Sequence, residues 1–178
     1  DVNGDGKIDG SDQVMISPYG TTPRIQYGLG MNVTYKKFDF GVFFNGSAKR
    51  TIMISGISPF GQSDYNVMQF IADDYWSESN PNPNAKYPRL TSEGSANNYT
   101  TNSLWVADAS YMKLRTLELY YNFSQEMMKK SKFIKGAKVF ARGHDLFCVD
   151  KIKVLDPENI GTNHPTMTQY TFGVNLSF

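Results

Sequence analysis

The sequence predicts an all-β chain, an antiparallel segment of a transmembrane β-barrel with long connecting loops. Aromatic residues make up 14% of its 178 residues, although only 40% of the residues are hydrophobic. Apolar residues recur at every second position in five short bursts, and the stretches between the bursts are rich in Asn, Ser, Thr, Gly and Pro. This alternation is typical of strands with one apolar face and one wet face, from which membrane barrels are built.

The first two predicted strands form a hairpin. From Tyr27 to Tyr35, Tyr, Leu, Met and Val alternate with Gly, Asn and Thr. From Phe38 to Asn45, Phe and Val alternate with Asp, Gly, Phe and Asn. Because only Lys36 and Lys37 separate the two bursts, we expect a two-residue turn between antiparallel strands.

Three more strands are predicted in the second half of the chain. They run from about Tyr111 to Phe123, from Lys138 to Leu146 and from Tyr170 to Phe178, with Val139, Ala141 and Gly143 expected to face outward. The predicted regions are a loop at 1–23, a strand pair at 24–49, a long loop at 50–109, a strand pair at 110–146, a loop at 147–167 and a terminal strand at 168–178. Long loops are typical of the extracellular side of a barrel.

The polar faces of these strands are rich in Gly, Asn and Thr rather than Lys and Glu. A sheet facing bulk water usually carries more charge, whereas a hydrated barrel lumen tolerates small neutral residues. We therefore expect the apolar faces to contact lipid. Tyr35 with Phe38, and Phe123 with Phe178, lie at strand ends, as in an aromatic girdle at the membrane boundary.

Five strands are too few to close a barrel. Adjacent strands lie about 4.8 Å apart, so five span roughly 24 Å and leave two open edges. Open edges are costly in lipid, and the smallest membrane barrels use about eight strands. The chain also opens at Asp1 inside a loop motif and shows no signal peptide, so we expect a segment cut from a longer protein.

Composition argues against other classes of protein. A net charge of +1 gives no sign of a nucleic-acid partner. The sequence has no run of about 18 apolar residues, which a transmembrane helix requires. Cys148 is the only cysteine, so it forms no internal disulfide and is interpreted as a small filler on a strand.

The sequence lacks the constellations that enzymes use. His144 and His164 have no Cys or acidic residue at metal-ligand spacing, and no nucleophile elbow, phosphate loop or dinucleotide motif occurs. Asp73, Asp74 and Glu78 could resemble the carboxylate pair of a glycosidase, but such a cluster in a long loop is more typical of a solvated surface. We expect no enzymatic activity.

The first twelve residues have the spacing of a calcium-binding loop. Oxygen donors occupy alternate positions, with Gly6 at the sharp turn: Asp1, Asn3, Asp5, Lys7 through its carbonyl, Asp9 and Asp12. Asp12 stands where a longer Glu would close the site around the ion. The sequence predicts Ca²⁺ here, and the alternative is a turn whose side chains bond only the backbone.

Two further groups of residues are candidate sites. The last strand carries apolar side chains at alternate positions up to the terminal residue, and these resemble the signal read by the outer-membrane assembly machinery: Tyr170, Phe172, Val174, Leu176 and Phe178. The alternative is a buried terminal strand of a soluble domain. Within the loops, Tyr75, Trp76 and Trp105 could stack on sugar rings or contact a partner, although packing inside the loops is the simpler interpretation. A short helix over 65–76 would bury Val67, Phe70, Ile71 and Trp76.

Ordered phrases along the whole chain resemble the SusC/RagA family of TonB-linked outer-membrane transporters. They are the opening Asp-Val-Asn-Gly-Asp-Gly-Lys-Ile-Asp at 1–9, Pro23 followed by Tyr27-Gly-Leu29, Tyr35-Lys-Lys-Phe-Asp39, Tyr75-Trp76, Asn80-Pro-Asn82, Pro88-Arg89, Ser103-Leu-Trp-Val-Ala-Asp-Ala-Ser-Tyr-Met-Lys-Leu-Arg115, Asp156-Pro-Glu158 and the aromatic C-terminus. The chain departs from the family at Lys113, where Arg is usual, and at Gly143-His-Asp-Leu146, where Gly-Gln-Asn-Leu is common.

The resemblance implies that the chain is the last five or so strands of a barrel of about 22 strands, plugged by an N-terminal domain. Such a protein lies in the outer membrane of a Gram-negative bacterium, in contact with its lipid. It imports large solutes, oligosaccharides or peptides. A SusD-like surface lipoprotein acts as its lid, the TonB complex supplies energy through the N-terminal region, and importers of this family often form dimers.

Two alternatives remain open at this point. A secreted β-sandwich binding module with a dockerin-like calcium loop would also combine strands, aromatic residues and the motif at 1–12. The alternating tail that ends on Phe178 argues against it, because a sandwich has no need of such an end. A small glycan-active enzyme is the weaker alternative, since the catalytic constellation is missing.

Overall fold

The computed structural model describes residues 1–54, 67–90, 98, 102–129, 133–159, 164 and 166–178. The chain divides into two compact units. One comprises Asp1–Thr22 and Thr51–Asp108, and the other comprises Pro23–Arg50 and Ala109–Phe178.

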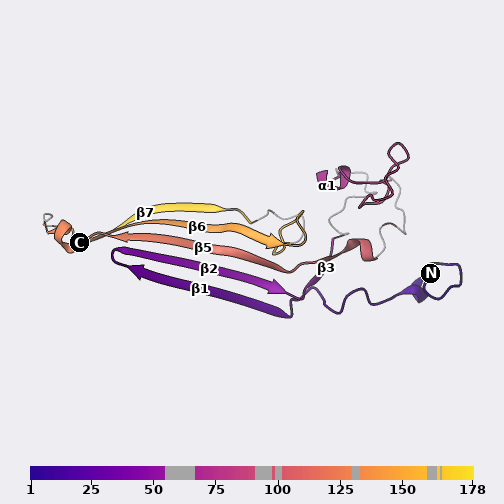
Figure 1. Cartoon of the computed structure of the whole chain (residues 1–178), viewed down its shortest axis with the longest axis horizontal. Helices are drawn as coiled ribbons and strands as arrows, with labels where there is room; N and C mark the ends of the chain where they lie inside the picture. Colours follow the sequence, from indigo (N-terminus) through magenta and orange to yellow (C-terminus); the bar gives the residue numbers. More distant parts are fainter. Residues whose placement is uncertain (55–66, 91–97, 99–101, 130–132, 160–163, 165) are drawn as a thin grey trace. The chain divides into compact units, whose positions relative to one another are not determined.

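The second unit is a five-stranded antiparallel sheet in which every strand pairs with the next one along the chain (Figure 1). Its strands are β1 (Ile25–Tyr35), β2 (Phe38–Ala48), β5 (Tyr111–Asn122), β6 (Gly136–Asp150) and β7 (Gln169–Ser177). The five predicted strands and the two-residue turn at Lys36 and Lys37 are confirmed. A one-turn helix, α3 (Gln125–Met128), lies in the connection between β5 and β6.

The register aligns the apolar faces of all five strands. One row across the sheet consists of Tyr35, Phe38, Tyr121, Val139 and Val174. The next row consists of Val33, Phe40, Leu119, Ala141 and Phe172. Most of these side chains are exposed, with Phe172 at 77%. Gly143 lies in the following row, between Leu117 and Tyr170. The outward orientation predicted for Val139, Ala141 and Gly143 is therefore confirmed.

The opposite face of the sheet is polar and hydrogen-bonded across strands. The Asp39 carboxylate accepts hydrogen bonds from the Thr34 hydroxyl at 2.8 Å and the Asn122 amide at 2.7 Å. Arg142 forms an ion pair with Glu118, with 2.5 Å between Nε and Oε1. This face therefore combines the predicted small residues with a few charges that neutralise one another.

At two places in this sheet, the aromatic ring of one strand lies over a glycine of the neighbouring strand. A Cβ built on Gly173 would lie 2.5 Å from the ring of Phe140, and one built on Gly46 would lie 2.5 Å from the ring of Tyr27. Real side chains do not approach so closely, so each ring occupies the space that a side chain would take. Because its ring lies over Gly46, Tyr27 can donate a hydrogen bond from its hydroxyl to the Tyr111 carbonyl at 3.0 Å.

β6 is longer than predicted. The sequence places the end of this strand at Leu146 and a loop from 147 onward, whereas β6 continues to Asp150. Phe147 and Val149 continue the apolar alternation and are 47% and 54% exposed. The connection to β7 therefore begins at 151.

The first unit packs around a small aromatic core. It contains η1 (Gly10–Asp12), a hairpin of β3 (Thr51–Met53) with β4 (Val106–Asp108), α1 (Gln69–Ala72) and η3 (Ser103–Trp105). Ile71, Tyr87 and Trp105 form its buried cluster. Among the described residues of the chain, none of the helices is long and apolar enough to cross a membrane.

The predicted helix over 65–76 is confirmed only for its central turn, and 65–66 lie outside the described residues. Ile71 is buried as predicted, Phe70 and Trp76 are half-buried, and Val67 is exposed. The helix ends early because the backbone that follows it is hydrogen-bonded to Tyr87. The Trp76 NH donates to the Tyr87 carbonyl, and the Tyr87 NH donates to the Asp74 carbonyl, both at 3.0 Å.

Candidate functional site

A β-bulge brings charged residues together where β5 and β6 approach the 151–168 connection. The register of β5 passes from Thr116 directly to Leu114 against both neighbouring strands, so Arg115 is the extra residue. On β6, two residues stand opposite Arg115, and one of them, Asp145, has a φ of 51°. Asp is among the few side chains that adopt this left-handed conformation readily.

The bulge decides which face of the sheet receives Lys113. Strict alternation from Leu117 would place Lys113 on the apolar face. With one residue inserted, Lys113 instead lies opposite Asn45 and Cys148, on the polar face. The bulge thereby keeps an ammonium group off the apolar face, where a charge is costly.

Lys113 is buried, with only 4% of its surface exposed. Its Nζ lies 2.9 Å from Oδ1 of Asp156 and 2.9 Å from Oε2 of Glu158. A buried ammonium without a partner would carry a large desolvation cost. Two carboxylates from the 151–168 connection offset that cost here.

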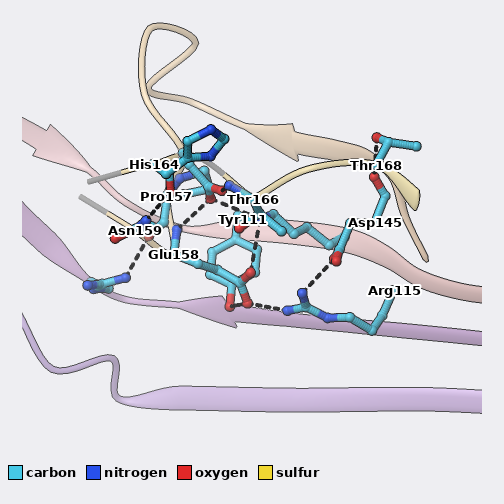
Figure 2. Close-up of polar contacts among 12 residues, drawn as sticks. Tyr111, Arg115, Asp145, Pro157, Glu158, Asn159, His164, Thr166 and Thr168 are labelled. Atoms are coloured by element: carbon cyan, nitrogen blue, oxygen red, sulfur yellow. Dashed lines mark hydrogen bonds and ion pairs between the residues drawn. The ribbon is translucent and has the colours of Figure 1, made fainter. Parts of the chain in front are cut away.

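Glu158 is the acceptor for three side chains of β5. Besides Lys113, its carboxylate receives hydrogen bonds from the Tyr111 hydroxyl at 2.7 Å and from Arg115 Nη2 (Figure 2). Arg115 also reaches Asp145 Oδ1 at 2.5 Å through its other terminal nitrogen. Arg115 therefore links the bulge to the loop.

We call six residues the loop clamp: Tyr111, Lys113, Arg115, Asp145, Asp156 and Glu158. Further contacts hold the same loop. Arg50 donates to the Pro157 carbonyl at 2.8 Å, and the Thr168 hydroxyl donates to the Asp145 carbonyl at 2.8 Å. Figure 2 shows these groups converging from the strands and from the connection.

Both loop carboxylates of the clamp are held in their charged form. Burial alone would raise the pKa of Asp156, but hydrogen bonds from Lys113, from Thr166 and from the backbone NH of Glu158 outweigh it and lower that pKa well below its usual value. Burial likewise opposes ionisation of Glu158, and its bonds to Lys113, Tyr111 and Arg115 lower its pKa. The clamp is therefore a fixed ionic contact at neutral pH.

The sequence alone does not indicate that the two halves of the loop clamp contact each other. The segments 111–115 and 156–158 contribute to the family resemblance, but about forty residues separate them and no spacing rule joins them. The bulge that makes their contact possible was not predicted either. Lys113 and Arg115, two basic residues at alternate positions beside Met112 and Leu114, were the signal that could have indicated a buried acidic partner.

The loop at 1–12 closes through hydrogen bonds to its own backbone. The Asp1 carboxylate accepts from the NH groups of Gly4, Asp5 and Gly6, and Asp12 accepts from those of Val2 and Asp9. Asn3, Asp5 and Asp9 each accept from the NH two residues ahead. In the part of the chain that the structure describes, no three His, Cys, Asp or Glu side chains gather as a metal site. Calcium at Asp1, Asn3, Asp5, Lys7, Asp9 and Asp12 stays a prediction.

The other candidate residues lie in two different settings. On β7, Tyr170, Phe172, Val174 and Leu176 share one exposed face, and Phe178 follows the end of the strand. Trp105 is only 1% exposed, stacks on Tyr87 with 6.2 Å between ring centroids and donates from Nε1 to the Asn98 carbonyl at 2.7 Å. Trp105 therefore packs inside its unit, whereas Tyr75 and Trp76 are half-buried.

Comparisons with known proteins show similarity to TonB-dependent receptors. No protein-family model matches the chain. Over its whole length the chain is 27% identical to TonB-dependent receptor P26 of Formosa agariphila and 25% identical to TonB-dependent receptor SusC of Bacteroides thetaiotaomicron. The chain is thus similar over its whole length to SusC-type TonB-dependent receptors. It spans 19% and 17% of the length of these two proteins.

The fold of the chain is also found in a solved structure. The structure of the RagAB peptide transporter matches 90% of the chain with a TM-score of 0.71 and 23% identity, over 18% of the matched chain. The match confirms the predicted fold class, a run of antiparallel strands from a barrel wall that this chain alone leaves open. The names of the relatives are those of receptors and a transporter, which supports the expectation that the chain is not an enzyme.

Proposed function

We propose that the chain forms part of the wall and outer loops of a TonB-dependent importer in the outer membrane of a Gram-negative bacterium. The observation that carries this proposal is the register, which places exposed apolar residues of all five strands on one face. A continuous apolar face of this kind is rare on soluble proteins, whereas it is what lipid requires. The likeness to SusC and to the RagAB transporter agrees with it.

The connections support an orientation in the membrane. The turn at Lys36 and Lys37, the connection from β5 to β6 and the C-terminus lie at one end of the sheet, and the connections that contain 50–109 and 151–168 start from the other end. Barrels of this class have short turns on the periplasmic side and long loops outside. The loop clamp then lies at the extracellular end of the wall, on its lumen side.

In this arrangement the clamp would hold the 151–168 loop against the wall near the mouth of the barrel. We propose that the loops contact a SusD-like lipoprotein and that the solute is an oligosaccharide or a peptide. The name of the RagAB transporter states that it carries peptides, and this supports a peptide as the solute. The TonB complex would act through the N-terminal region, and pairs of importers would form dimers.

The proposed function is tested on the source cells. Dividing 20.1 kDa by the 19% covered in receptor P26 gives about 106 kDa for the whole protein. We expect peptides of this sequence in an outer-membrane protein of that size, and we expect cells that lack the gene to lose uptake of one oligosaccharide or peptide class. A soluble 20.1 kDa protein would instead favour the secreted β-sandwich module.

We also propose that the loop at 1–12 binds Ca²⁺. The alternate oxygen donors and the left-handed turns at Gly4 and Gly6, with φ of 76° and 84°, support it. Replacing Asp5 with Ala (Asp5→Ala) should abolish calcium binding by this loop, because Asp5 supplies a central ligand. Calorimetry on the purified whole protein measures this, with Asp73→Ala as the control in another loop. Unchanged binding in Asp5→Ala would remove the calcium proposal.

A further inference from the structure

An apolar groove of about 520 Å³ lies on the outward face of the sheet, close to the short turn between β1 and β2. Its walls come from four strands and include Phe38, Leu119, Tyr121, Val139, Phe172 and Val174. Its floor includes Ala141 of β6, a short side chain that lies between Leu119 and Phe172 in the register. The larger neighbours on both sides leave a trough over Ala141.

The groove lies over strands that are already paired. β2, β5 and β6 each have hydrogen-bonded neighbours on both sides within this chain, and β7 forms its last wall. Closing the barrel would add strands beyond β1 and β7 without covering this face. The groove therefore persists in the whole protein.

Basic residues surround the end of the sheet nearest the groove. Lys36 and Lys37 are exposed and immediately precede Phe38, and Lys36 Nζ lies 5.2 Å above the ring of Tyr35. In the connection from β5 to β6, Lys129 and Lys135 are exposed as well. Among the described residues of these two connections, the only acidic one is Glu126.

We propose that this groove binds an acyl chain of an anionic phospholipid whose headgroup is held by Lys36 and Lys37. Apolar walls suit the chain, and the adjacent ammonium groups suit the phosphate. The inference rests on the proposed membrane location, and it adds a specific lipid site at the periplasmic end of the wall. The ligand comes from the periplasmic leaflet, because the groove lies at the end with the short turns.

The test uses the full-length receptor in nanodiscs of phosphatidylethanolamine with a minor share of phosphatidylglycerol. Bound lipid is measured by native mass spectrometry. We expect the wild type to retain phosphatidylglycerol above its share in the bilayer. The double variant Lys36→Asn with Lys37→Gln should lower this enrichment about fivefold for each lysine removed. The factor corresponds to the attraction between one basic residue and an anionic membrane surface. Asn is chosen because Lys36 has a φ of 55°.

Two more variants complete the design. Ala141→Phe fills the trough and should remove the retained lipid while leaving the lysines in place. The control is Lys49→Asn with Lys153→Asn, which removes two exposed lysines with φ of 56° and 64° at the other end of the sheet and should retain the lipid. Equal phosphatidylglycerol in the wild type and the Lys36 and Lys37 variant would overturn the site, as would equal loss in the control. A receptor that fails to enter the membrane at all would contradict the proposed function instead.

Discussion

At the residue scale, Lys113 shows how a charge is accommodated in an apolar strand. The side chain is buried and its Nζ is shared by Asp156 and Glu158 at 2.9 Å each. Replacing it with Met should leave two carboxylates without their main partner, which costs about 3–5 kcal/mol for a buried pair. We expect residues 151–159 to lose protection in hydrogen exchange of the whole protein.

Lys138→Met is the matched control for this change. Lys138 Nζ lies 4.0 Å from Asp39 and its side chain is 38% exposed, so its loss should cost less than about 1 kcal/mol. Lys113→Arg should keep the protection, because Arg carries the same charge. Equal protection of 151–159 in the wild type and in Lys113→Met would show that the clamp does not hold the loop.

At the scale of elements, the alternation of apolar and polar residues predicts which face of the sheet each side chain occupies as well as where the strands lie. Because side chains on a strand alternate between faces, the apolar residues of β1, β2 and β7 were placed on one face before the register was known. The bulge at Arg115 was not predicted. Its local sign is a change of phase between Leu114 and Leu117, and alternation alone does not say that the extra residue faces carboxylates from a distant loop. The helix at 65–76 was overestimated because its apolar residues pack on Tyr87, and the partner that ends the helix lies outside that segment.

Gly173 provides a test of how strands pack across the sheet. A side chain at Gly173 would meet the ring of Phe140, so Gly173→Val should overpack the wall at a cost of about 1–3 kcal/mol. We expect a smaller fraction of heat-modifiable, folded receptor on semi-native gels. Gly136→Val is the control, because its Cβ would meet Ser177 only at 3.7 Å. Phe140→Ala should rescue Gly173→Val, and a failure of that rescue would show that the ring is not the cause.

At the scale of the whole molecule, the sheet has one apolar face and two open edges. Among the residues that the structure describes, β1 and β7 each pair with a neighbour on only one side. In lipid, every unpaired NH and carbonyl of such an edge costs several kcal/mol, and in water the exposed apolar face would drive association. In either solvent, these strands therefore need partners at both edges to be stable.

This dependence gives a prediction for the isolated segment. Residues 1–178, refolded alone in detergent, should form no heat-modifiable species, whereas the full-length receptor treated in the same way should. The full-length receptor is the control, because it supplies partners for both edges of the same sheet. If the isolated chain instead folded cooperatively in water as a monomer, its apolar face would have to be covered from within. The secreted β-sandwich would then be the better account of the sequence.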